Sequence, residues 1–146
     1  MDKFKVLSGI SVGNIVFDSD KTALLNAIGT PKTDLNRRGI NSMVYDSCVV
    51  LLENEKVVEV SFKDFSHIEL MGIDFESMTH KETLNALYAL DKNVYESLGF
   101  FVFTDLCVSL TGFEDQSGDT SDKAINFFVK GRWDSQLDQM TKRYGF

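Results

Sequence analysis

The chain has 146 residues, 43% of them hydrophobic and 25% charged, and a chain of this length buries roughly two thirds of its unfolded surface in one core. Its 22 acidic and 15 basic side chains give a net charge of −7, which disfavours nucleic acid and anionic membranes as partners and favours a basic protein. Two cysteines are too few for a disulfide framework, and no stretch is apolar enough for a signal peptide or a membrane span. We therefore expect one cytoplasmic domain over residues 1–146.

The first third of the chain predicts a short hairpin followed by a helix. Gly13-Asn14 suits a two-residue turn between residues 4–12 and 15–17. Ser19 or Asp20 then caps a helix that runs to about Ile28, where Gly29 ends it. Residues 32–41 are polar and are expected to form a loop.

The clearest strand pattern lies in residues 44–62. Val58, Val60 and Phe62 alternate with polar residues, and residues 53–56 separate this run from an apolar run before it. The pattern predicts a β-hairpin with one buried face.

The second half of the chain repeats the order of the first. Phe4-Lys5, Ser8 and Ile10 recur in order as Phe62-Lys63, Ser66 and Ile68, and later identities continue through a turn, a helix and a strand. Thr79 and Glu82 form a capping box at the start of the second helix. Residues 95–113 then resemble the hairpin of residues 44–62. We expect an internal duplication, with repeats at about 4–61 and 62–113.

The C-terminal extension, residues 114–146, begins with the most acidic stretch of the chain, EDQSGDTSD. This composition is typical of a solvated loop, and a strand and a short helix over residues 134–143 are expected to follow. The whole pattern predicts an α+β fold. Two hairpin-helix-hairpin repeats would form one antiparallel sheet, with the helices on one face and the other face open.

The run LLNAIGTP at residues 24–31, which follows a hairpin and precedes antiparallel strands, resembles the helix-Leu-Gly-x-Pro segment of two related families. These are the tandem-repeat β-lactamase inhibitor proteins and the small outer-membrane assembly lipoproteins. The acidic chain of this length also resembles bacterial immunity proteins, which neutralise a toxin delivered by a neighbouring cell. Both resemblances imply a domain that works by binding another protein.

Few residues suggest catalysis or metal binding. Cys48 lies in an apolar run and is expected to be an inert core thiol, although His67 or His80 could activate it if either came near. Neither histidine has a partner at a recognised metal-ligand spacing, and His80 is expected at the surface. Asp115, Asp119 and Asp122 leave three interpretations open: weak binding of a hard cation, contact with a basic partner, or plain solvation.

These observations favour a non-enzymatic inhibitor without a cofactor, most simply an immunity protein for a basic toxin such as a nuclease. A small-molecule-binding domain or enzyme with a pocket between sheet and helices is the alternative, and a homodimeric scaffold is a third possibility. The predicted partner-binding residues are those of the acidic loop and two aromatic anchors: Glu114, Asp115, Asp119, Asp122, Phe101 and Trp133.

Overall fold

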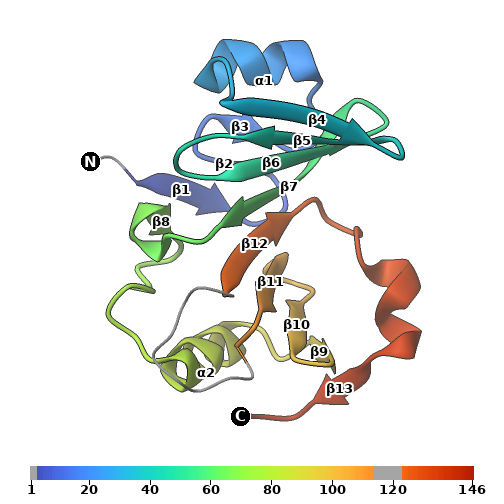
Figure 1. Ribbon diagram of the computed structural model, residues 1–146. Coiled ribbons are helices and arrows are strands. Elements are labelled where there is room, and N and C mark those ends of the chain that lie inside the picture. The colour runs from blue at the N-terminus through green and yellow to red at the C-terminus, as the bar shows by residue number, and fades with distance from the viewer. Residues whose placement is uncertain (1–2, 114–122) are drawn as a thin grey trace.

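The computed structural model describes residues 3–113 and 123–146 and has an α+β architecture dominated by sheet. A nine-stranded sheet and a four-stranded sheet make up most of the molecule. Helix α1 (Lys21–Ile28) lies at one end of the molecule and α2 (His80–Leu90) at the other (Figure 1). The fold class predicted from the sequence is therefore confirmed at the level of α+β.

Every pairing in the large sheet is antiparallel. From one edge to the other, its strands are β13 (Thr141–Arg143), β9 (Val94–Ser97), β10 (Phe100–Phe103), β11 (Val108–Thr111), β12 (Ala124–Phe128), β7 (Lys56–Phe62), β6 (Val49–Glu53), β5 (Ile40–Val44) and β4 (Thr33–Arg37). The pair β12–β7 joins the two halves, with Phe62 opposite Ile125 and Val60 opposite Phe127. All four of these side chains are buried, so the junction lies in the core.

The small sheet has the order β3 (Ile15–Val16), β2 (Ser11–Val12), β1 (Phe4–Leu7) and β8 (Ile68–Glu69), and β1 and β8 are parallel. Gly13-Asn14 forms the predicted turn between β2 and β3. A Cβ at Gly13 would lie 2.8 Å from the Phe4 ring, so this position requires glycine for space as well as for its positive φ of 58°. The expected strand over residues 4–12 is split by a turn at Gly9.

Both helices begin at the side chains that the sequence predicted. The Asp20 carboxylate accepts a hydrogen bond from the Ala23 N–H at 2.9 Å and caps α1. Thr79 and Glu82 form the capping box of α2, with bonds of 3.1 and 2.9 Å to each other's backbone N–H groups. Gly29, with φ of 84°, ends α1 as expected.

Two segments differ from the sequence-based expectation. Residues 32–41 were expected to form a loop, but most of them belong to the β4–β5 hairpin, whose turn is Arg38-Gly39. Residues 134–143 were expected to form a helix, but they form a 3-10 helix, η2 (Asp134–Gln139), followed by β13. No side chain caps η2, and the pairing of β13 with β9 takes the last residues away from any helix.

The core has two parts. The larger one spans both sheets and both helices, and it includes Leu24 of α1 and Leu87 of α2. A smaller cluster consists of Val102, Cys107 and Phe128. It packs against Phe100 of β10 and against three side chains of residues 129–146, which we call the C-terminal segment: Trp133, Leu137 and Met140. The C-terminal segment thus covers part of the second face of the large sheet around β10–β12, and the expectation of a fully open second face is wrong.

Candidate functional site

The predicted contact residues are only partly placed by the structure. Glu114, Asp115, Asp119 and Asp122 lie outside the described residues. Phe101 is only 3% exposed, and its ring packs 5.4 Å from that of Phe146, which argues against its predicted role as an exposed anchor.

Trp133 is half-buried. Its ring centre lies 5.1 Å from that of Phe100 and 5.5 Å from the Arg132 guanidinium. The contact with Phe100 attaches this part of the chain to β10, and a further role of Trp133 in partner binding stays a prediction.

The candidate reactive side chains are buried. Burial raises the pKa of the Cys48 thiol to about 11, so the reactive thiolate is scarce at neutral pH. Burial also raises the pKa of the Cys107 thiol. His80, expected at the surface, is only 9% exposed and packs edge-on against Phe113. Among residues 3–113 and 123–146, no group of three or more His, Cys, Asp or Glu side chains could hold a metal ion.

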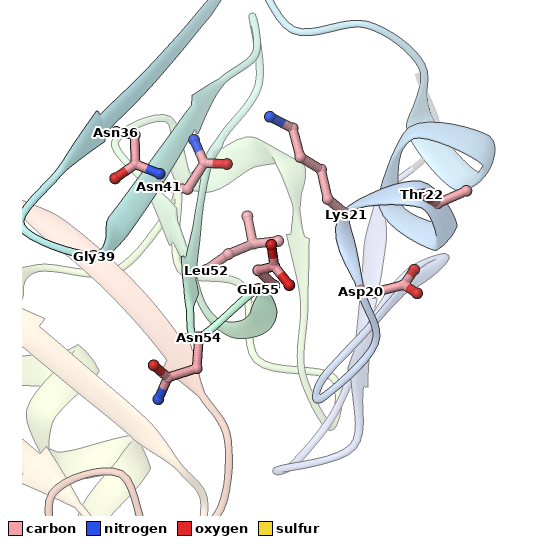
Figure 2. A pocket seen from close by; sticks show the side chains of 9 residues that line it. All are labelled: Asp20, Lys21, Thr22, Asn36, Gly39, Asn41, Leu52, Asn54 and Glu55. Atoms are coloured by element: carbon pink, nitrogen blue, oxygen red, sulfur yellow. The ribbon is translucent and has the colours of Figure 1, made fainter.

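A polar cavity lies between α1 and two hairpin turns, and we call it the α1 cleft. Figure 2 shows its lining, which encloses about 500 Å³. Asp20, Lys21 and Thr22 come from the start of α1, Asn36, Gly39 and Asn41 from the β4–β5 hairpin, and Leu52, Asn54 and Glu55 from the β6–β7 hairpin. Leu52 is fully buried, whereas most of the lining is polar and exposed.

Left-handed backbone at the hairpin turns shapes this cleft. Arg38 and Gly39 have φ of 54° and 81°, and Asn54 and Glu55 have φ of 51° and 65°. Two consecutive positive φ values are typical of the two-residue turns that fit the twist of a hairpin.

A network of polar contacts holds one wall of the cleft. The Lys21 ammonium donates to the Asp34 carboxylate at 2.5 Å, and the Asn41 amide donates to the same carboxylate at 2.5 Å and to the Leu35 carbonyl at 3.0 Å. Hydrogen bonds from Lys21 and Asn41 lower the pKa of Asp34. Lys21 is thereby matched by Asp34, and Asp20 and Glu55 leave the cleft with an excess of negative charge.

The cleft borders an unpaired sheet edge. β4 is the last strand of the large sheet, all five of its residues are exposed, and no strand among the described residues pairs with its outer side. Asn36 lies on β4 and lines the cleft, so the edge and the cleft are one continuous surface. The sequence pattern does not indicate this site, because the polar residues 32–41 predict a loop. The Arg-Gly pair between polar residues was the available signal of a hairpin turn.

Comparison with known proteins identifies no family for this chain. No protein-family model matches the chain, and no curated protein matches it. A crystal structure of an extracellular protein containing an SCP domain, from Bacillus anthracis str. Ames, matches 90% of this chain at 14% identity with a TM-score of 0.47. The chain spans about half of that protein, 49%. Within the described residues, no helix is both long and apolar enough to cross a membrane.

Proposed function

We propose that this protein is a non-enzymatic inhibitor that binds a basic protein, most simply an immunity protein that neutralises a cognate bacterial toxin in the cytoplasm. The observation that carries the proposal is the α1 cleft, whose lining holds two acidic side chains, Asp20 and Glu55, against one basic side chain, Lys21. It adjoins the edge strand β4, which no strand among the described residues covers on its outer side. Such a surface offers backbone hydrogen bonds and acidic side chains together, which are the groups that a basic protein segment can use.

The charge of the whole chain supports the same partner class. A net charge of −7 attracts a basic protein before contact and speeds association, and a standard interface needs about 800 Å² from each partner. The cleft alone is smaller than such an interface. The acidic residues Glu114, Asp115, Asp119 and Asp122 remain proposed as additional contacts, together with Trp133.

We also propose that the fold arose by internal duplication. In chain order, α1-β4-β5-β6-β7 parallels α2-β9-β10-β11-β12, and the two sets occupy opposite halves of the large sheet. The second unit in this proposal includes β12 and so extends beyond the expected end of the repeat at residue 113. The turns Arg38-Gly39 and Leu98-Gly99 occupy matching places, with φ of 54° and 81° in one and 50° and 80° in the other. An open binding surface at one end and its closed counterpart at the other would then be two versions of one design.

The proposal is tested with the product of the gene immediately upstream. Co-expression with the tagged full-length chain is expected to give a stable complex, and cells that carry both genes are expected to survive expression of the upstream product. The complex is expected to weaken as salt rises, because charge attraction contributes to it. Absence of both the complex and the protection would contradict the proposal.

The volume of the α1 cleft favours one alternative, a small-molecule-binding protein or enzyme. Its volume of about 500 Å³ lies within the usual range of ligand pockets. A thermal-shift screen against metabolites tests this candidate, since a ligand that binds only the folded state raises Tm. A hit that Asn41→Ala abolishes would favour the alternative over the inhibitor.

A further inference from the structure

The two edges of the nine-stranded sheet are treated differently. At one edge, β9 is covered by β13, which pairs antiparallel with it through Thr141 opposite Glu96 and Arg143 opposite Val94. At the other edge, β4 has no such cover among the described residues. Both edge strands lead into two-residue turns with matching left-handed backbone, Leu98-Gly99 after β9 and Arg38-Gly39 after β4. The β9 edge therefore shows how a strand is added to this type of edge.

Side chains of β13 and the C-terminus also enter the space beside α2. The Arg143 guanidinium donates to the Glu96 carboxylate at 2.6 Å and lies 4.7 Å from the centre of the Phe146 ring. These residues, with Phe101 and Lys81 of α2, line a cavity of about 320 Å³. An added strand thus places a cationic side chain against an acidic residue, between a helix and the edge hairpin.

The β4 edge offers the corresponding groups. Arg37 and Ile40 flank the two-residue turn and pair with each other, so the alternate residues Asp34 and Asn36 direct their peptide groups away from β5. The cross-strand pair of Asn36 and Asn41 lines the α1 cleft, as the pair of Glu96 and Phe101 lines the cavity beside α2. The outward side of β4 and the cleft thus face the same incoming strand.

The charges in the cleft define the side chain that fits. Asp34 uses only two of the roughly four acceptor positions of a carboxylate, for Lys21 and Asn41. Asp34 adjoins the cleft through Lys21 and Asn41, and the lining itself holds the acidic Asp20 and Glu55 against the basic Lys21. A residue opposite Asp34 occupies the place that Arg143 takes opposite Val94. Because Arg143 lies against Glu96, an arginine or lysine in that place would lie beside Asp34 and point toward Asn36, the corresponding residue, at the side of the α1 cleft.

We propose that the free edge of β4 binds an extended segment of the inhibited protein, added antiparallel as a tenth strand, with an arginine or lysine that enters the α1 cleft. The inference rests on the proposed function, since it assigns the toxin to this edge. A partner segment is favoured over a second copy of this chain, because two copies, each with a net charge of −7, repel one another.

A proline at Asn36 removes the outward N–H on which the added strand depends. Edge strands tolerate proline where the N–H faces solvent, so Asn36→Pro is expected to keep the native circular dichroism spectrum. Asn36→Thr is the matched control, because it also loses the amide side chain but keeps the N–H. A second variant, Asp20→Asn with Glu55→Gln, removes two charges and keeps the cap of α1, since asparagine caps as well as aspartate.

The probe is a displayed library of random ten-residue peptides, selected on the full chain. Selected peptides are expected to contain arginine or lysine and to bind Asn36→Pro at least about tenfold more weakly than the native chain and Asn36→Thr, as loss of backbone hydrogen bonds predicts. The double charge variant is expected to bind more weakly too. A library without enrichment, or peptides that bind Asn36→Pro as tightly as the native chain, would overturn the inference.

Co-purification with the toxin and measurement of the oligomeric state distinguish failure of the edge site from failure of the inhibitor function. A toxin that co-purifies equally with native chain and Asn36→Pro overturns the edge as its site but leaves the inhibitor function standing. A toxin that binds neither overturns the function, while the peptide selection still decides whether the edge accepts strands. Self-association of the native chain that Asn36→Pro abolishes, measured by sedimentation, assigns the edge to a second copy and overturns the proposed occupant.

Discussion

Replacing Arg132 with methionine tests the ion cluster that joins the C-terminal segment to the first half of the sheet. The Arg132 guanidinium donates to Glu59 on β7 at 3.2 Å and to Glu53 on β6. The Arg132 and Glu59 side chains are only 13% and 12% exposed, whereas that of Glu53 is 39% exposed. Removal of the arginine therefore leaves mainly one carboxylate, Glu59, buried without its cation.

The expected cost follows from that burial. Leaving one partner of a buried pair without its counter-charge costs about 3–5 kcal/mol, and the exposed Glu53 adds little. For a domain near 150 residues, about 3 kcal/mol lowers Tm by roughly 6–12 °C. Arg132→Met with Glu59→Met is expected to recover most of the loss, because two apolar side chains replace the pair without a stranded charge.

The loss in Arg132→Met is expected to depend on pH. Burial is the largest cause acting on Glu59 and raises its pKa above the ordinary 4.5, while Arg132 lowers it. Without Arg132, the folded-state pKa rises further, so the folded state holds the proton more tightly than the unfolded state. The part of the deficit that comes from the Glu59 charge is then absent below about pH 4.5, where Glu59 is protonated in both folded proteins. It grows as pH rises from the folded-state pKa of Glu59 in the native chain to its higher folded-state pKa in Arg132→Met, and it is constant above that.

Urea unfolding at several pH values measures these quantities for the native chain and both variants. A deficit below about 1 kcal/mol at pH 7 would refute the reasoning, since that is the range of a surface pair. A double variant no more stable than Arg132→Met would also refute it, because the loss would then come from packing and not from the stranded charge.

Three further predictions concern other parts of the fold. The buried Asp91 carboxylate accepts hydrogen bonds from the N–H groups of Asn93, Asp105 and Leu106 at 2.8, 2.8 and 2.9 Å. Asp91→Ala is therefore expected to lower the free energy of unfolding by about 3 kcal/mol or more. A loss of less than about 1 kcal/mol in urea unfolding would contradict this. Thr79→Ala is expected to cost about 1 kcal/mol while Thr79→Ser costs much less, as thermal unfolding will show. Cys48 is expected to resist alkylation by iodoacetamide at pH 7.5 until the chain is unfolded, because burial raises its pKa to about 11. Rapid labelling of Cys48 in the native protein, detected by mass spectrometry, would contradict this.

Structure that depends on neighbouring residues was predictable from the sequence. The Asp20 cap, the capping box of Thr79 and Glu82, and the Gly13-Asn14 turn each use side chains that act within a few residues of themselves. The hairpin predicted over residues 44–62 is confirmed in part, as β6 and β7, because Val60 and Phe62 alternate with polar residues and are buried. Val44 belongs to β5 instead, and a register shift in the β6–β7 pairing buries Val57 in place of Val58.

Structure that depends on distant partners was not predictable. β4 carries no apolar alternation, and its five residues are exposed, so only its pairing with β5 makes it a strand. β13 is a strand because it meets β9, far away in the sequence, and three residues hold no signal of that partner. The α1 cleft needs three separate segments in one place, which no local pattern records.

The different treatment of the two sheet edges bears on function. An unpaired edge strand invites pairing with other chains, so proteins cover such edges or place charges on them. The C-terminal strand β13 covers β9, whereas no strand in residues 3–113 or 123–146 covers the outer side of β4, on which Asp34 and Arg37 are exposed. Charges of both signs disfavour uncontrolled stacking of identical edges, whereas a basic segment in the correct register can satisfy the backbone and the acidic cleft together. If the proposed function is correct, this edge receives a specific partner, and the difference in binding between Asn36→Pro and Asn36→Thr tests that proposal.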